Sequence, residues 1–119
     1  MRILLLRHAE TEWNRERRFQ GWRDSPLSAT GREQAESAAR LLAASPLAAV
    51  WSSPLARARE TALLIAAPHR LPVQEADNFK EMGFGAWEGL TRGEVEQRFP
   101  AEIRAWAETP DKAGWPGAE

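Results

Sequence analysis

The sequence predicts an α/β fold, in which helices cover both faces of a mainly parallel sheet to give three layers. Two short apolar runs, residues 3–6 and 47–51, are each followed by a longer segment with apolar residues at helical spacing. This alternation of strand and helix favours parallel strands joined by right-handed crossovers. The chain has 119 residues, which is one domain at most and short for a sheet covered on both faces.

The first strand and the first helix follow one another near the N-terminus. Ile3–Leu6 is predicted to be a strand buried on both faces, because all four residues are apolar. Residues 15–26 are rich in turn formers and predict a loop. Ser28 can then cap a helix that runs to about residue 44 and is stopped by Pro46. The apolar face of this helix consists of Ala35, Ala38, Ala39 and Leu42.

The middle of the chain repeats the pattern of strand and helix. Leu47–Trp51 is predicted to be a second buried strand, and Leu71–Glu75 a third. Between them, Ser53 as N-cap and Pro54 as first helical residue predict a second helix. Residues 79–89 alternate glycines with large aromatic residues, which indicates a tightly turning loop held by its rings. The apolar face of the second helix consists of Leu55, Ala58, Ala62, Ile65 and Ala66.

Two further helices are predicted near the C-terminus. Thr91 and Glu94 have the spacing of a capping box for a short helix that ends before Pro100. Residues 101–107 can form one or two further turns, and residues 109–119 are rich in helix breakers and predict a loop. The inward-facing residues of the last helix are predicted to be Ile103, Trp106 and Ala107.

Composition and charge argue against several kinds of partner. The 16 basic residues are balanced by 17 acidic ones and form no block longer than Arg17-Arg18, so no nucleic-acid surface is expected. The chain has no cysteine, and His69 lies in what reads as an exposed connection, so we assign no metal site. The apolar run 3–6 is too short for a signal peptide or a membrane span. We therefore expect a soluble, cytoplasmic protein without a membrane partner.

Candidate catalytic residues directly follow the first predicted strand. Arg7, His8, Glu10, Thr11 and Asn14 lie within eight residues at its carboxyl end, the edge at which α/β sheets bind ligands. A neutral histidine can attack phosphorus if cations hold the phosphoryl oxygens and an acid protonates the leaving group. Taken alone, His8 fits either this role or that of a hydrogen-bonded histidine at the end of a strand.

Other residues are open to two interpretations when taken alone. Arg57 lies one turn into the second predicted helix, where a cation opposes the helix dipole. Arg57 could therefore belong to an anion-binding site, or it could form an ion pair at the surface, as Arg59 could. Taken alone, Glu81 can be read as a solvated carboxylate in a loop, and Asn14 and Gln20 can be read as residues that form turns.

Four motifs, in the same order, resemble those of the histidine phosphatase superfamily, also called the phosphoglycerate mutase-like family. Together they cover nearly the whole chain, which makes the resemblance far more specific than one motif would be. The motifs are Arg7-His8-Ala9-Glu10-Thr11 with Trp13-Asn14, Pro26-Leu27-Ser28 to Gly31 with Gln34-Ala35, Ser52-Ser53-Pro54-Leu55 with Arg57-Ala58 and Thr61-Ala62, and Glu81-Met82 with Phe84 to Leu90.

The resemblance implies a role for each site residue. His8 is implied to be the nucleophile that becomes phosphohistidine, and Glu81 the proton donor to the leaving oxygen. Arg7 and Arg57 are implied to hold the phosphoryl oxygens, while Glu10 and Thr11 are implied to orient the cluster. The implied reaction is hydrolysis of a small phosphorylated substrate, a phosphomonoester, without metal or cofactor. The implied substrate-binding residues are Asn14, Gln20 and Gly21.

Two departures from the family pattern bear on the catalytic site. Ala9 replaces a commoner glycine, which is tolerated if the backbone there has no positive φ. The family's second histidine, on a motif like S-H-G, has no counterpart, and residues 116–119 resemble the P-G-G-E that precedes it. We therefore expect residues 1–119 to be the N-terminal portion of a single histidine phosphatase domain, poorly active or inactive alone. The exposed first strand is expected to recruit a second copy or a missing C-terminal half.

Within the family, residues 71–73 and 81–89 most resemble the α-ribazole phosphatases, which act late in cobalamin synthesis. Three alternatives remain open at this point. They are a phosphoglycerate mutase, a broad-specificity phosphatase, and an inactive half-domain that binds phosphate or a partner chain.

Overall fold

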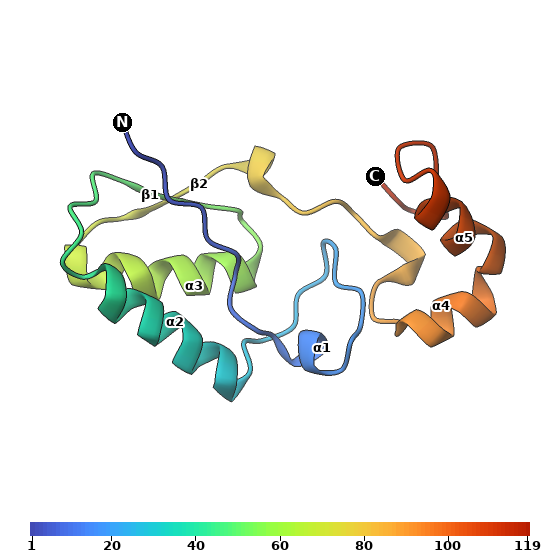
Figure 1. Ribbon diagram of the computed structural model, residues 1–119, viewed down its shortest axis with the longest axis horizontal. Helices are drawn as coiled ribbons and strands as arrows, with labels where there is room; N and C mark the ends of the chain where they lie inside the picture. The colour runs from blue at the N-terminus through green and yellow to red at the C-terminus, as the bar shows by residue number, and fades with distance from the viewer. The chain divides into compact units, whose positions relative to one another are not determined.

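The computed structural model describes all residues 1–119 and consists of helices with a small parallel sheet, which confirms the predicted α/β class (Figure 1). The chain forms two compact units. The first unit contains residues 1–11 and 26–80, and the second contains residues 12–25 and 81–119. No helix is both long enough and apolar enough to cross a membrane.

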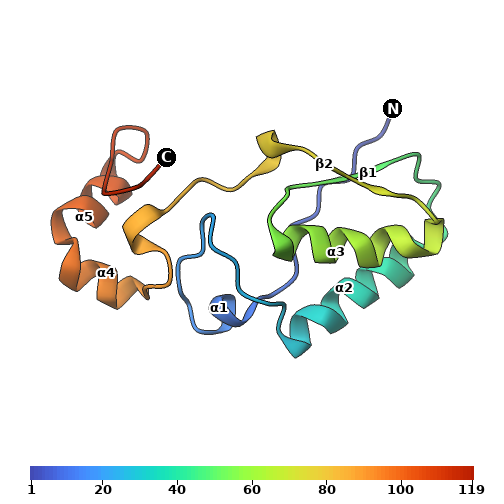
Figure 2. The same ribbon diagram turned by 180° about the vertical axis from the view of Figure 1, so that it is seen from behind.

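The first unit contains the predicted parallel pairing. Strands β1 (Val50–Ser52) and β2 (Val73–Glu75) pair in parallel, with Val50 opposite Val73. The connection between them consists of helix α3 (Ala56–Ala66) and the 3₁₀ turn η1 (Ala67–His69). Figures 1 and 2 show α3 and helix α2 (Ala29–Leu42) on the same side of the strand pair.

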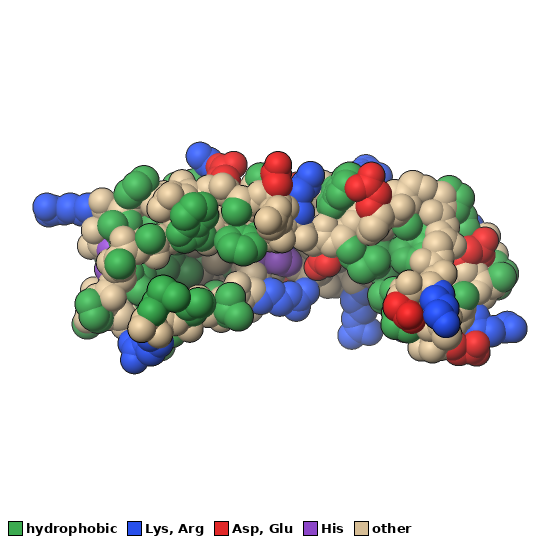
Figure 3. Space-filling model, turned by 90° about the horizontal axis from the view of Figure 1, so that it is seen from above, with side chains coloured by type: hydrophobic (Ala, Val, Ile, Leu, Met, Phe, Trp, Pro, Cys, Tyr) green, Lys and Arg blue, Asp and Glu red, His purple; other side chains and the backbone are tan.

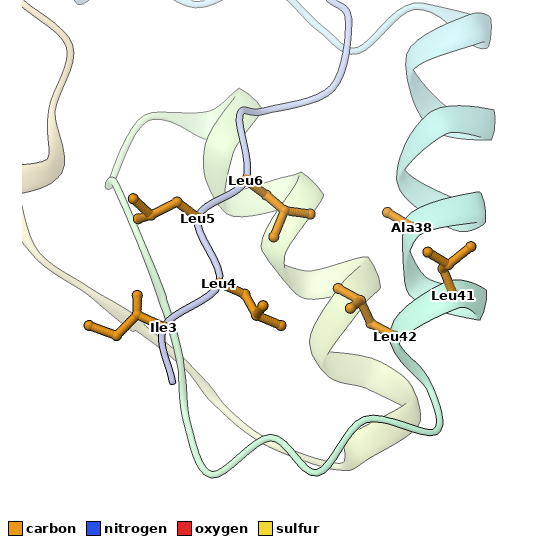
Figure 4. A pocket seen from close by; sticks show the side chains of 7 residues that line it. All are labelled: Ile3, Leu4, Leu5, Leu6, Ala38, Leu41 and Leu42. Atoms are coloured by element: carbon orange, nitrogen blue, oxygen red, sulfur yellow. The ribbon is translucent and has the colours of Figure 1, made fainter. Parts of the chain in front are cut away.

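The predicted first strand does not form. Residues 1–10 belong to no helix or strand, and Leu5 is 93% exposed rather than buried. In Figure 4, Leu4 and Leu6 point toward α2 whereas Ile3 and Leu5 point away from it. An apolar run becomes a buried strand only where neighbouring strands take up its backbone hydrogen bonds and other elements cover both faces. In the first unit β1 and β2 pair with each other and leave Ile3–Leu6 outside the sheet.

The two long helices begin differently. The hydroxyl of Ser28 accepts a hydrogen bond from the Gly31 amide (2.9 Å), which confirms the predicted cap of α2. Helix α3 begins at Ala56 with Leu55 as N-cap, so the predicted start at Ser53 and Pro54 is wrong. The reason is local, because the Ser53 hydroxyl accepts from the Leu55 amide (3.2 Å) in a turn that precedes the helix.

The remaining predictions for the first unit need smaller corrections. Ala35 and Ala39 of α2 are buried as predicted, and Ile65 and Ala66 line the buried face of α3. Trp51 in β1 is 53% exposed, so this strand is not buried on both faces. His69 lies at the end of η1 and is half-buried, rather than in an exposed connection. A short 3₁₀ turn, η2 (Asp77–Phe79), lies just before residues 81–119, the longer segment of the second unit.

The second unit is built on a core of aromatic side chains. Its elements are α1 (Glu12–Arg15), the 3₁₀ turn η3 (Gly85–Trp87), α4 (Arg92–Arg98) and α5 (Pro100–Glu108). Trp87 is fully buried, and its ring stacks on that of Trp115 with centroids 3.7 Å apart. The buried core consists of Trp87, Val95, Ile103 and Trp115.

The C-terminal helices confirm two predictions and correct two others. The capping box of Thr91 and Glu94 is present at the start of α4. Ile103 is buried and Trp106 packs on the core, but Ala107 is exposed and so does not face inward. The end of the chain is more than a loop, because Ala118 pairs with Phe84 in an isolated antiparallel bridge. The C-terminal residues therefore contact the segment that carries Phe84 and Trp87, and the Trp115 indole donates to the Phe84 carbonyl oxygen (2.6 Å).

Candidate active site

The imidazole of His8 is held in one orientation by its own neighbour. His8 is half-buried, and its Nδ1 lies 2.7 Å from the carbonyl oxygen of Ala9. A carbonyl oxygen can only accept, so Nδ1 carries the hydrogen in this contact. In the neutral ring the lone pair is then on Nε2. Nε2 is therefore the nitrogen that can attack an electrophile.

The backbone beside His8 is attached to helix α3 through Thr61. The amide of Ala9 donates to the Thr61 hydroxyl (3.0 Å), and that hydroxyl donates to the carbonyl of Arg57 (2.8 Å). All three residues are buried. Two hydrogen bonds thus connect the candidate nucleophile to the helical turn that carries the candidate phosphate-binding cation.

The structure separates the two arginines of α3. Arg59 forms an ion pair with Glu75 (2.6 Å), and both side chains are roughly half exposed. Arg57, the second residue of the helix, is only 3% exposed. A cation buried at the positive end of a helix is unfavourable unless acceptors or an anion compensate it. The surface interpretation therefore holds for Arg59 and not for Arg57, whereas Arg7 is exposed.

Glu10 connects the motif after His8 to the start of α2. Its carboxylate accepts from the Ser28 hydroxyl (2.6 Å), and its amide donates to the Gln34 side chain (3.1 Å). Gly31 packs so closely that a Cβ atom there would lie 1.9 Å from the Glu10 carbonyl oxygen. Ala9 does not have a positive φ, which explains why alanine is accepted at this position.

In the second unit, Trp22 joins the predicted substrate-binding loop to Glu81. Gln20 and Gly21 are buried, and Gly21 has a φ of +57°. The Trp22 indole donates to the carbonyl oxygen of Glu81 (2.7 Å). The Glu81 carboxylate is exposed and accepts from the Met82 amide (2.9 Å). Asn14, the remaining predicted residue, is half-buried in α1.

The predicted site residues form two groups, one in each unit. Arg7, His8 and Arg57 belong to the first unit, and the other four to the second. The residues that connect each group were not predicted as site residues. Thr61 lies four positions after Arg57 in a predicted helix, and this spacing places both residues on one face. The spacing could therefore have indicated that Thr61 lies near the site. Trp22, whose partner Glu81 is 59 positions away, gave no comparable signal.

Comparisons with known proteins identify the family of this chain. A family model described as histidine phosphatase superfamily (branch 1) matches residues 3–119. Phosphoserine phosphatase 1 of Hydrogenobacter thermophilus is 40% identical over 119 residues, which are 100% of this chain and 56% of that protein.

Two solved structures show the same likeness. YhfR of Bacillus stearothermophilus is 37% identical with a TM-score of 0.87, over 95% of this chain and 56% of that one. The α-ribazole phosphatase of Shigella flexneri is 33% identical with a TM-score of 0.86, over 94% of this chain and 55% of that one. The chain thus spans about half the length of the relatives that it matches. Its motifs, its fold and its sequence agree, and the chain belongs to the histidine phosphatase superfamily.

Proposed function

We propose that residues 1–119 are the N-terminal portion of a single histidine phosphatase domain that hydrolyses phosphomonoesters through a phosphohistidine at His8. The observation that supports this best is the contact of Nδ1 with the Ala9 carbonyl oxygen at 2.7 Å. That contact leaves the lone pair on Nε2, as a nucleophilic histidine requires.

The proposed reaction has two steps. In the first, Nε2 of His8 forms a bond to phosphorus while the bond from phosphorus to the ester oxygen breaks, and Glu81 gives its proton to that oxygen. In the second, water attacks the phosphohistidine, Glu81 takes a proton from the water, and phosphate and neutral His8 are released. Arg7 and Arg57 hold the phosphoryl oxygens, and Asn14 adds a donor.

For the substrate we propose α-ribazole 5'-phosphate, with Gln20 and Gly21 among the binding residues. Support comes from the motif around Glu81 and from the likeness to the α-ribazole phosphatase structure. Phosphoserine is a second candidate, because the relative that is 40% identical is named a phosphoserine phosphatase. Phosphoglycerate mutase activity is a third candidate, because a relative from Hamiltonella defensa, 35% identical over 111 residues, is named a phosphoglycerate mutase.

Rates on a panel of phosphomonoesters test this function. Turnover by the chain alone is expected to be slow. We expect kcat/KM to be highest for α-ribazole 5'-phosphate and turnover to be lost in His8→Ala. Equal rates on all esters would identify a broad-specificity phosphatase, and isomerisation of 3-phosphoglycerate without phosphate release a mutase. Vanadate binding without turnover would identify a half-domain that only binds phosphate.

We further propose that the apolar surface of Ile3–Leu6, Leu41 and Leu42 is covered by the C-terminal half of such a domain, or by a second copy of this chain. Hydrophobic side chains gather over the first unit in Figure 3, and Figure 4 shows this surface closely. Leu5 is 93% and Leu41 83% exposed, and a cavity of about 310 Å³ lies between the two segments. Because relatives are almost twice as long, the C-terminal half is the favoured occupant.

A further inference from the structure

We propose that Trp22 is a positioning residue for the acid Glu81, and that Glu88 fixes Trp22 in this task. The inference rests on the proposed function, in which Glu81 protonates the leaving oxygen. It adds two residues to that function and a coupling between the substrate-binding loop and the acid.

Glu81 needs support from outside its own segment. Residues 80–83 lie in no helix or strand, and the carboxylate is exposed. Its hydrogen bond to the adjacent Met82 amide (2.9 Å) sets the side chain relative to the local backbone but does not hold that backbone. A general acid must lie within hydrogen-bond reach of the atom that it protonates, so a mobile backbone would lower its effectiveness.

Trp22 supplies this support. Its indole N–H donates to the Glu81 carbonyl oxygen at 2.7 Å across 59 positions of sequence. Its ring also lies against Gly83, where a Cβ atom would be 3.3 Å from the indole carbons. The side chain is 39% exposed, so burial alone does not keep it in place. One residue thus holds the segment on both sides of Met82.

Glu88 holds Trp22 and the loop after Glu81 at the same time. One carboxylate oxygen accepts from the Trp22 amide (2.9 Å) and from the Phe84 amide (3.1 Å). Gly21 makes room for this oxygen, because a Cβ atom there would lie 2.4 Å from it. Bonds of a carboxylate to backbone N–H groups are among the stronger hydrogen bonds in proteins. The loop at Gly21 and the segment of the acid are therefore joined through one carboxylate oxygen.

The test compares two substrates whose leaving groups differ in their need for a proton. p-Nitrophenolate leaves without a proton, whereas an alkoxide such as that of phosphoserine needs one. Trp22→Phe keeps the ring and removes the N–H. Under single-turnover conditions with the chain in excess, we expect Trp22→Phe to slow phosphoserine cleavage at least tenfold and p-nitrophenyl phosphate cleavage less than threefold. Glu88→Ala should show the same selective loss, and Glu88→Gln, which keeps an acceptor oxygen, should show a smaller one.

Three other outcomes would contradict the inference or the proposed function. Equal slowing of both esters in Trp22→Phe, with a lowered thermal midpoint, would show that Trp22 only supports the fold. Unchanged rates on both esters would overturn the inference while leaving the proposed function intact. If the unaltered chain cleaves neither ester, residues 1–119 are the inactive half-domain, the proposed function fails for this chain, and the inference fails with it.

Discussion

Thr61 and Ala9 lie 52 positions apart in the sequence, yet the Ala9 amide donates to the Thr61 hydroxyl at 3.0 Å. The same hydroxyl donates to the carbonyl oxygen of Arg57. A single buried side chain therefore fixes the backbone next to the candidate nucleophile against the helix of the candidate phosphate-binding arginine. This relationship can be tested by substitution without adding volume.

Thr61→Val should lower the free energy of unfolding by about 1–3 kcal/mol, because it leaves the buried Ala9 amide without its acceptor. It should also slow the phosphorylation of His8, since the backbone beside His8 loses its attachment to α3. Thr61→Ser keeps the hydroxyl and should restore the phosphorylation rate even if some stability is lost. Urea unfolding and single-turnover rates measure the two effects. A serine variant as slow as the valine variant would contradict the role of the hydroxyl.

Gly31→Ala should destabilise the protein by about 1–3 kcal/mol, because the new methyl group would overlap the Glu10 carbonyl oxygen. Gly93→Ala is a matched control in the first turn of α4, where a Cβ atom meets nothing within 4 Å. That variant should be more stable than the unaltered chain by up to about 1 kcal/mol. Thermal or urea unfolding of the two variants gives the comparison. Equal effects would mean that α2 does not pack on Glu10 as described.

Local sequence signals predicted those parts of the fold that depend on local interactions. Ser28 caps α2 and Thr91 with Glu94 caps α4, because cap, helix start and partner lie within four residues of one another. The parallel pairing of β1 and β2 followed from the order of strand and helix. Ile3–Leu6 was predicted wrongly, because an apolar run becomes a buried strand only where other strands and helices surround it.

The candidate site, like the fold, could be predicted only in part from the sequence. His8 and Arg57 could be proposed from residue type and position, and the structure shows that Arg57 is buried. The spacing of Thr61 from Arg57 was a signal for the residue, but the supporting contacts themselves could not be predicted, because Thr61 and Glu88 bind amides that are 52 and 66 positions away. The start of α3 was missed for a local reason, since a serine before a proline can end a turn as well as cap a helix.

Glu94 should make stability depend on pH in the acid range. The Thr91 amide donates to its carboxylate (2.7 Å), and this bond, with the nearby charges of Arg18 and Arg98, lowers the pKa of Glu94 from its ordinary value of 4.5. A lowered pKa in the folded state stabilises the protein above the ordinary value, and the stabilisation is lost as the pH falls through the lowered value.

Glu94→Gln removes this titration and so provides the comparison. The unaltered chain should exceed Glu94→Gln in urea midpoint at neutral pH, and the difference should shrink as the pH falls below 4.5. Urea titrations across that range measure the difference. A difference that stays constant with pH would show that the carboxylate charge has no part in the capping box.

The exposed apolar surface should govern association of this chain. Leu5→Lys places a charge at a side chain that is 93% exposed and should reduce self-association and dye binding without lowering the thermal midpoint. Leu63→Lys, at a 42% exposed leucine of α3, is the matched control and should change association less. Sedimentation velocity over a range of concentrations gives the comparison. Equal effects of the two substitutions would place the contact elsewhere.

The most direct test of the account is to locate the phosphoryl group after reaction with p-nitrophenyl phosphate. The chain has two histidines, so His8→Ala and His69→Ala form a complete pair of variants. After an alkaline quench, which preserves phosphohistidine, intact mass and peptide mapping identify the modified residue. We predict one phosphoryl group on His8, present in His69→Ala and absent from His8→Ala. A phosphoryl group that persists in His8→Ala would contradict His8 as the nucleophile, and no phosphoryl group on the unaltered chain would contradict the proposed function for residues 1–119 alone.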